Sequence, residues 1–446
     1  MCNCPDPRHD HPRRMKKGID RRDLLKYVTG AAGIAALGPW IGKKLPDAFG
    51  APVSQKRLVV IEMSGGCDTF SMIVPTNLTS YYSRRPNIAI PAASTIALAG
   101  VGGSAGYALH PSMPKIQALW NEGKAAFANR VGYPTENQSH FTSQDIYSYG
   151  VRNSFGPLGI QPSGWIARYA DLYAATPMGA VAVGAGRPTA FVGGSSNPLQ
   201  VGSVASFKFD GERSTYANNR TYQMKLIKDI IQAFPSANLP GEVRDAQDAA
   251  LTLSDQLGTA LTNYNLVAGN PVYANTGISA ALRDVAAIIN GGFSTNIFYT
   301  VFGGFDLHSA LNDGVSKTTG DQAKLMKQLD DAIGAFAADM KNQGTWNDTV
   351  VCVITEFGRR NYENGSVGLD HGGAFTELVV GGAVSGGKFV GPDLSNSDIS
   401  TSETLAYAVD FRDVYKEVIN DHLGHNPAPV FPETQPINNS NLGLIP

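Results

Sequence analysis

Apolar runs alternate with helical patterns along residues 57–425, and together they predict the elements of one core. Uninterrupted, often β-branched apolar runs predict strands over Arg57–Met63, Ala125–Ala128, Ile297–Phe302 and Thr349–Ile354. Apolar residues at helical spacing predict helices over Pro111–Glu122, Ala280–Ile289, Asp321–Lys341 and Asp410–Leu423. This alternation favours an α/β fold with a largely parallel sheet.

The middle of the chain, about residues 151–280, is less regular. It is rich in Gly, Ser, Asn and Pro up to about residue 213, and then helical over about 217–233 and 243–262. We interpret it as an elaboration laid over the core of residues 51–446.

Polar side chains follow each of the four predicted strands. The candidates are Asp68, Ser139 and His140, Asp306 and His308, and Glu356 with Asp370 and His371. Open α/β sheets place their ligands beyond the carboxyl ends of the strands, so these turns are expected to share one site. Divalent metals bind carboxylate oxygen, and zinc and manganese also bind imidazole nitrogen.

Each candidate also has a simpler interpretation. Asp306 and His308 lie on the same side of an extended segment and could chelate one ion, but a single loop histidine is more often a hydrogen-bonded structural residue. Asp68 follows Gly65-Gly66, where an aspartate commonly forms a turn or caps a helix. Arg359 could bind a substrate anion or pair with Glu356 or Glu363.

Composition and charge narrow the class of protein. Only 17% of residues are charged and 49 are glycine, which suits a compact protein with many loops. Residues 1–50 hold ten Lys and Arg against five Asp and Glu, so residues 51–446 carry 26 basic and 33 acidic residues, a net charge of about −7. We therefore expect no nucleic-acid partner and no binding to anionic lipid.

The basic amino-terminus resembles an export signal. Asp20–Lys26 is similar to the twin-arginine motif, the apolar run Tyr27–Ile41 follows it, and Ala48–Ala51 offers small residues for cleavage. The run is too short and weakly apolar for a stable membrane span. Residues 1–50 are thus expected to be a leader that directs the protein through the twin-arginine machinery to the periplasm or beyond; the alternative is an amphipathic first helix.

Two cysteines, Cys67 and Cys352, remain after this leader. They could form a disulfide in an oxidising compartment or remain as two buried thiols, and we favour the thiols.

Seven motifs in order resemble the exported family called domain of unknown function 1501. They are Gly-Gly-x-Asp at 65–68, Ser-His-Phe at 139–141, Gly-Phe-Asp-x-His at 304–308, Thr-Glu-Phe-Gly-Arg at 355–359, Glu-Asn-Gly at 363–365, Asp-His-Gly at 370–372 and Asp-Phe-Arg-x-Val-Tyr at 410–415. That family is placed in the alkaline phosphatase and sulfatase clan. The resemblance implies an alkaline-phosphatase-like, three-layer α/β/α sandwich. The clan hydrolyses phosphate or sulfate esters with two metals and a Ser, Thr or modified Cys nucleophile.

Only some of the clan's metal ligands have a counterpart at the matching position of this chain. Asp306, His308 and His371 fit the first metal site, next to Asp370. For the second site, Ser64 stands where the clan has Asp, with Asp68 four residues on, and Glu356-Phe357 stands in place of Asp-His. The resemblance therefore implies one ion (zinc, manganese, calcium or magnesium) rather than two.

The resemblance to this clan also implies catalytic roles for residues of this chain. The nucleophile position falls at Ser139-His140, where Ser139, or a water aligned by His140, would attack. Arg359 would stabilise developing charge, and Glu356 would be a ligand or a general base.

Two functions remain open on this basis. The first is an exported metal-dependent hydrolase that acts on a small-molecule or polysaccharide phosphate or sulfate ester. The second is a non-catalytic binding or surface-assembly protein on the same scaffold with a degraded metal site.

Overall fold

A computed structural model describes residues 55–101, 103–151, 163–174, 176–184, 186–196, 198–207, 217–233, 239–431 and 441–446. The expected leader and export motif, in residues 1–50, lie outside the described residues. Within them, nine strands form one sheet in the order β11-β5-β10-β9-β1-β8-β6-β7, with β12 also paired to β5. The strands are β1 (Arg57–Ser64), β5 (Ala125–Gly132), β6 (Ala180–Val183), β7 (Leu199–Val201), β8 (Ile297–Gly303), β9 (Thr349–Ile354), β10 (Phe375–Gly381), β11 (Lys388–Val390) and β12 (Val409–Asp410).

The sheet is largely parallel, as the sequence predicts. Strand β1 pairs in parallel with β8 and β9, and β6 pairs in parallel with β8 and β7. The exception is β10, which runs antiparallel between β9 and β5. It was not predicted, because its seven residues follow a long polar loop without an intervening helix.

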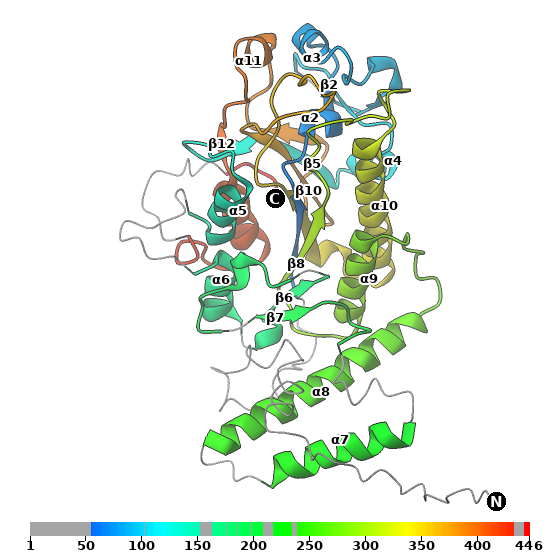
Figure 1. The fold of residues 1–446 in the computed structure, drawn as a ribbon, viewed down its shortest axis with the longest axis vertical. Helices are drawn as coiled ribbons and strands as arrows, with labels where there is room; N and C mark the ends of the chain where they lie inside the picture. Colours follow the sequence, from blue (N-terminus) through cyan, green and yellow to red (C-terminus); the bar gives the residue numbers. More distant parts are fainter. Residues whose placement is uncertain are drawn as a thin grey trace, which may run out of the picture.

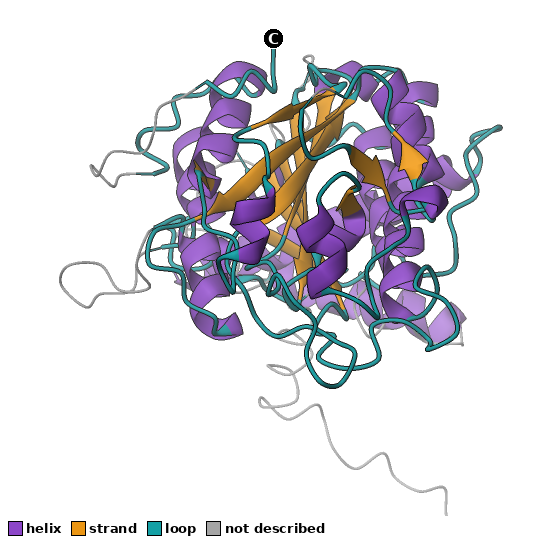
Figure 2. Cartoon of the chain, turned by 90° about the horizontal axis from the view of Figure 1, so that it is seen from above, coloured by secondary structure: helices purple, strands orange, loops and turns teal. Residues whose placement is uncertain are grey.

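Helices cover both faces of the sheet and complete the predicted three-layer sandwich (Figures 1 and 2). One face packs against α4, α8, α9 and α10, and the other against α5, α6 and α12. The described helices are α2 (Thr69–Met72), α3 (Thr79–Arg84), α4 (Pro114–Asn121), α5 (His140–Tyr149), α6 (Trp165–Tyr173), α7 (Ala217–Gln232), α8 (Leu239–Asn265), α9 (Gly277–Asn290), α10 (Asp321–Asn342), α11 (Asn396–Ser400) and α12 (Phe411–Glu417). Residues Val418–His422 continue α12 as a π-helical turn.

The central strand β1 shows why the predicted strands lie inside the molecule. Val59 and Ile61 pack into one core cluster, whereas Leu58 and Val60 pack into the cluster on the opposite face. A strand buried on both faces needs apolar residues at every position, which is the uninterrupted pattern that marked it in the sequence.

The middle segment contributes to the sheet as well as covering it. Strands β6 and β7, which belong to this segment, extend the sheet beyond β8. Helix α8 packs along the core through buried Leu253 and Leu257, and α7 lies beside it at the bottom of Figure 1.

A small second sheet lies at the end of the molecule opposite α7 (Figure 1). It consists of β2 (Ile73–Pro75), β4 (Tyr107–Leu109) and β3 (Ile96–Ala97). Cys67 and Cys352 are both buried free thiols, as favoured from the sequence. No helix among the described residues is long and apolar enough to cross a bilayer.

Candidate metal centre

The loop after β9 folds back on itself and presents a histidine to the end of β8. The amide of Gly358 donates to the carbonyl of Gly373 (2.6 Å), and the amide of Gly372 donates to that of Gly358 (2.9 Å). These bonds set Arg359 opposite His371 in an antiparallel bridge. The two residues therefore reach the turn that follows β8 from one rigid hairpin.

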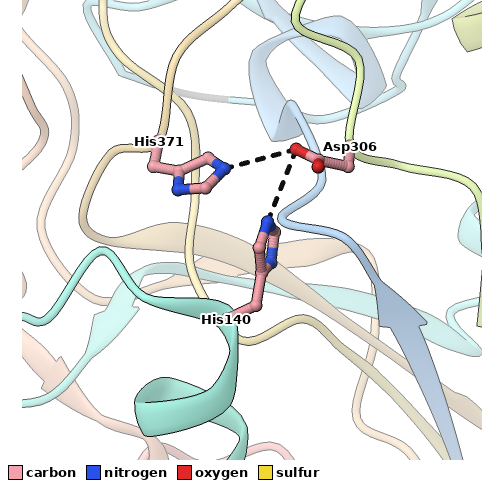
Figure 3. Close-up of side chains that lie close together, drawn as sticks. All are labelled: His140, Asp306 and His371. Atoms are coloured by element: carbon pink, nitrogen blue, oxygen red, sulfur yellow. Dashed lines mark hydrogen bonds and ion pairs between the residues drawn. The ribbon is translucent and has the colours of Figure 1, made fainter.

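Three histidines converge on one carboxylate oxygen. Oδ1 of Asp306 lies 2.9 Å from Nε2 of His308, 3.3 Å from Nε2 of His371 and 3.5 Å from Nε2 of His140. Figure 3 shows His140 rising from the start of α5 and His371 approaching from the hairpin. Ligand atoms of His140, Asp306 and His371 all lie within 4.8 Å of one another. We call these four residues (His140, Asp306, His308 and His371) the Asp306 cluster.

The other ring nitrogen of each histidine faces a hydrogen-bond acceptor. Nδ1 of His140 lies 2.7 Å from Oε1 of Glu356, which also accepts the amide of Gly65. Nδ1 of His371 lies 2.7 Å from the carbonyl of Gln138. Because such oxygens accept, each Nδ1 carries the proton and each Nε2 is left with a lone pair.

The third histidine follows the same pattern. Nδ1 of His308 lies 3.1 Å from Oδ1 of Asp370, which also accepts a bond from Nδ2 of Asn364 (3.1 Å). These hydrogen bonds from Asn364 and His308 lower the pKa of Asp370, so its carboxylate is ionised and accepts. Carboxylate or carbonyl partners that fix the tautomer in this way are typical of metal-ligating histidines.

The donor set fits a divalent cation. Nε2 of His308 and Nε2 of His371 lie only 2.9 Å apart, and two lone pairs that face each other at this distance repel unless a cation lies against both. Nε2 of His140 is buried and has no hydrogen-bond partner among the described residues. Burial is the main cause that lowers the pKa of His371, and the charge of Arg359 lowers it further, so its imidazole is neutral near pH 7 and able to bind a metal.

Arg359 holds the central carboxylate in its ionised form. Its Nη2 donates to Oδ1 of Asp306 at 2.7 Å. Partial burial acts to raise the pKa of Asp306, but the hydrogen bond and charge of Arg359 outweigh it and hold this pKa at about 2. The carboxylate is therefore anionic over the whole physiological range.

Two glycines let the β1 turn approach the cluster. Gly65 has φ of +118°, and a Cβ there would lie 2.5 Å from the amide nitrogen of Asp306. Gly66 has φ of +68°, and its Cβ would lie 2.3 Å from the ring of Phe357. Only glycine accepts both the positive φ and this contact, which explains the Gly-Gly pair in the sequence.

The structure brings together most of the candidate residues that the sequence indicated. Some of them have partners other than those expected. Asp306, His308 and His371 form the cluster as expected, and His140 joins them as a fourth candidate ligand. His140 was expected to align a water; in the structure its Nδ1 bonds Glu356 and its Nε2 faces Oδ1 of Asp306 at 3.5 Å. Glu356 and Asp370 were expected among the ligands, and instead they orient His140 and His308.

Asp68 is not part of the cluster. Its carboxylate lies 2.8 Å from Nη1 of Arg85 and accepts a 2.5 Å bond from the hydroxyl of Ser71, with both charged side chains almost fully buried. The structure therefore does not bring Asp68 to the other expected ligands, and its charge is balanced by a buried guanidinium.

Arg359 and Ser139, the other two residues expected to act on a substrate, differ in whether their side chains are free to contact one. The Arg359 side chain is 1% exposed and donates to the carbonyls of Gly66 and Leu369 as well as to Asp306; it further bonds the carbonyls of Gly65 and Phe305. It ties three loops together, so the expected anion-binding fork is not free. Ser139 is exposed, and its side chain does not cap α5.

Sequence reasoning missed three contributors to the site. The carbonyl of Gln138 holds His371, but a backbone carbonyl has no side-chain signature. Asn364 lies in the Glu-Asn-Gly motif and binds Asp370, and this motif was its only signal. Phe357 packs against the rings of His140 and His371, with ring centroids 4.9 Å and 4.8 Å away.

Solved structures that resemble this chain include sulfatases and alkaline phosphatases, and the overlap is loose. The PsFucS1 sulfatase from Pseudoalteromonas sp. is 13% identical with a TM-score of 0.31, covering 86% of this chain and 71% of that one. The alkaline phosphatase from the Antarctic bacterium TAB5 is 13% identical with a TM-score of 0.31, covering 77% and 96%. The lipoteichoic acid synthase LtaP from Listeria monocytogenes is 10% identical with a TM-score of 0.30, covering 86% and 80%.

Sequence comparison is informative for the carboxyl-terminal part. No curated protein matches the sequence. Residues 285–433, less than half of the chain, match the family model described as a protein of unknown function, DUF1501. Over this segment, which contains Asp306, His308, Glu356, Asp370 and His371, the match supports the family resemblance inferred from the motifs.

Proposed function

We propose that the protein is an exported hydrolase of phosphate or sulfate esters that depends on one divalent metal ion bound by the Asp306 cluster. The observation that carries this proposal is the convergence of three histidine Nε2 atoms on one carboxylate oxygen. Three imidazoles and a carboxylate favour zinc or manganese over calcium or magnesium, which prefer sites made of oxygen alone.

A divalent ion held there would supply Lewis-acid polarisation of an ester oxygen. The chain's own residues prepare the site for it. Glu356, Asp370 and the carbonyl of Gln138 hold the protons on Nδ1, and Arg359 keeps Asp306 ionised.

The substrate side of the site lies at the start of α5. His140 is the first residue of this ten-residue helix, whose unpaired first-turn amides favour an anionic group. The exposed hydroxyl of Ser139 lies next to His140 in the chain and is the proposed nucleophile. We do not assign a substrate role to Arg359, because its donors are bound within the protein.

A binding protein without catalytic activity is the second candidate, and one observation favours it. Asp68 is committed to Arg85, and Glu356 is committed to His140 and Gly65. Because the residues expected for a second ion already have partners within the protein, we expect one ion at most, and we do not propose the two-metal chemistry of the resembled clan for this chain.

Metal analysis tests the proposal directly. Protein stripped with a chelator and reloaded with zinc or manganese is expected to bind about one ion per chain, and His371→Ala is expected to lose it. His425→Ala is a matched control, because His425 contacts Tyr169 and Tyr173 instead of the cluster. Absence of bound metal in the folded wild type would overturn the metal site.

Activity assays separate the two candidates. The hydrolase is expected to cleave an aryl phosphate or an aryl sulfate only when loaded with metal, and Ser139→Ala is expected to reduce turnover while leaving metal content unchanged. Stoichiometric metal without cleavage of either ester would favour the binding protein. Export rests on residues 1–50 alone and is tested by replacing Arg21 and Arg22 with lysine and measuring the secreted fraction.

A further inference from the structure

Gln144, on α5 one helical turn after His140, connects this helix to two strand ends next to the Asp306 cluster. Its Nε2 lies 3.0 Å from Oγ of Ser64 and 3.4 Å from Oε1 of Glu356. Ser64 is the last residue of β1, and Glu356 follows β9. Residues four positions apart lie on the same face of a helix, so His140 and Gln144 both reach Glu356 from α5.

The chemistry of its two partners fixes the orientation of this amide. A carboxylate oxygen of Glu356 accepts hydrogen bonds and has none to donate, so the amide nitrogen of Gln144, and not the amide oxygen, must face it. The two hydrogens of that nitrogen match its two acceptors. Oγ of Ser64 is the nearer acceptor and anchors the amide.

Oε1 of Glu356 receives donors from three parts of the fold. It accepts the amide of Gly65 at 2.8 Å, lies 2.7 Å from Nδ1 of His140, and faces Nε2 of Gln144. The hydroxyl of Thr355 lies 3.1 Å from the other oxygen, Oε2. The Glu356 side chain is only 1% exposed, so a hydrogen bond lost here is not replaced by bulk water.

We propose that Gln144 is a positioning residue of the metal centre and acts through Glu356. Its amide holds Oε1 of Glu356 against Nδ1 of His140, which leaves the lone pair of Nε2 of His140 directed at Asp306. The affinity of the cluster for an ion thus depends on an uncharged side chain that is not a ligand. This inference rests on the proposed metal-dependent function and adds a residue that sets how firmly the ion is held.

Competition for zinc against a calibrated chelator tests this role on the full chain. Gln144→Leu keeps the approximate size of the side chain and removes the donor. It is expected to lower zinc affinity about fivefold, which corresponds to about 1 kcal/mol, the usual net contribution of one hydrogen bond. Ser64→Ala removes the anchor of the amide and is expected to lower the affinity in the same direction, so the test does not depend on one variant.

Gln117→Leu is the matched control. Gln117 is also a half-buried helical glutamine whose Nε2 donates to an oxygen, here the carbonyl of Ala97 at 2.8 Å. It lies on α4, which covers the opposite face of the sheet from α5. This variant is expected to bind zinc as the wild type does.

A double-mutant cycle with Glu356→Gln separates positioning from a general loss of structure. If Gln144 acts through the carboxylate, Gln144→Leu is expected to lower affinity by less than about twofold once Glu356 has been replaced. The same fivefold loss in both backgrounds would overturn the positioning role. So would an unchanged affinity of Gln144→Leu when the wild type binds zinc.

A second measurement needs no metal. In metal-free protein that carries isotope-labelled histidine, the Nδ1 proton of His140 is expected to exchange with water roughly fivefold faster in Gln144→Leu than in the wild type, because Glu356 holds it less firmly. The resonance is identified by its loss in His140→Asn. Faster exchange in a protein that binds no zinc would support the positioning role and contradict the proposed metal site. Zinc binding with unchanged exchange would contradict the positioning role alone.

Discussion

Two carboxylates next to the Asp306 cluster orient its histidines without being ligands themselves. Glu356 and Asp370 each bind the Nδ1 atom of a histidine and so decide where the lone pair of its Nε2 points. Glu356 is almost fully buried, and Asp370 is half exposed. The two carboxylates are orienting partners, and their removal is expected to weaken the site without deleting a ligand.

Replacing Asp370 with asparagine is therefore expected to lower metal affinity by about 10- to 100-fold. The amide can still face Nδ1 of His308, but it no longer carries the charge that makes the imidazole a stronger ligand. The measurement is competition for zinc against a calibrated chelator. Asp321→Asn, an exposed carboxylate on α10, is the control; equal affinities in both variants would contradict the orienting role.

A second residue with a testable property is Glu62, which lies beneath the site on β1. Burial is the main cause that raises its pKa, against a hydrogen bond from Tyr299 and with a contribution from the charge of Glu356, and the pKa reaches about 7 from an ordinary 4.5. The folded chain thus binds this proton more tightly than the unfolded chain. The resulting stabilisation is complete below about pH 4.5 and is lost as the pH rises through 7.

Glu62→Gln is expected to remove this pH dependence, because the amide stays neutral. Relative to the wild type, the variant should gain stability between pH 4.5 and 8, by at most about 3 kcal/mol. Urea unfolding midpoints measured across this pH range provide the test, with the exposed Glu403→Gln as the control. Parallel pH profiles for wild type and Glu62→Gln would show that the carboxyl is not perturbed.

At the scale of elements, a side chain of α10 caps the amino-terminus of the neighbouring helix α4. The local cap residue of α4, Met113, has no side chain that accepts a hydrogen bond. Asp330 on α10 accepts instead from the amides of Lys115 (3.2 Å) and Ile116 (2.8 Å). A buried carboxylate on a neighbouring helix therefore satisfies the amino-terminus of α4.

Asp330→Ala is expected to destabilise the protein by about 2 kcal/mol, since it removes a cap and leaves the amides of Lys115 and Ile116 unpaired, the second of them buried. Asp330→Asn, which keeps one acceptor oxygen, should recover part of the loss. The neighbouring Asp331→Ala breaks surface ion pairs with Lys115 and Lys327 and is expected to cost at most about 1 kcal/mol. Thermal unfolding of the three variants ranks their losses of stability. An equal loss for Asp330→Ala and Asp331→Ala would contradict the capping role of Asp330.

At the scale of the whole molecule, the segment that matches the family model is not a structural unit. Residues 285–433 include β8, β9, β10, β11 and β12. Strand β1 lies between β9 and β8, and β5 lies between β10 and β11. A chain limited to the matching segment would lack both of these central strands, and its own strands could not form one sheet.

A fragment of residues 285–433 is accordingly expected to remain unfolded, with no cooperative thermal transition by circular dichroism. Residues 55–446 serve as the control and are expected to unfold in a sharp transition. A folded fragment that binds metal would contradict the sheet order. The physical reason is that unpaired strand edges and exposed core faces outweigh the contacts left within the fragment.

The sequence by itself determined four strands of the sheet (β1, β5, β8 and β9), the helices α4, α9, α10 and α12, and the polar residues that follow these strands, because these patterns depend on neighbours a few positions away. It identified Asp306, His308 and His371, and it placed His140 near them. Tertiary structure alone decided the antiparallel direction of β10, the pairing of Asp68 with Arg85, and the partners that fix each histidine. His140 and Glu356 are 216 positions apart, and His371 and Gln138 are 233 apart. Which oxygen faces which nitrogen therefore follows from the order of strands in the sheet, which no local pattern encodes.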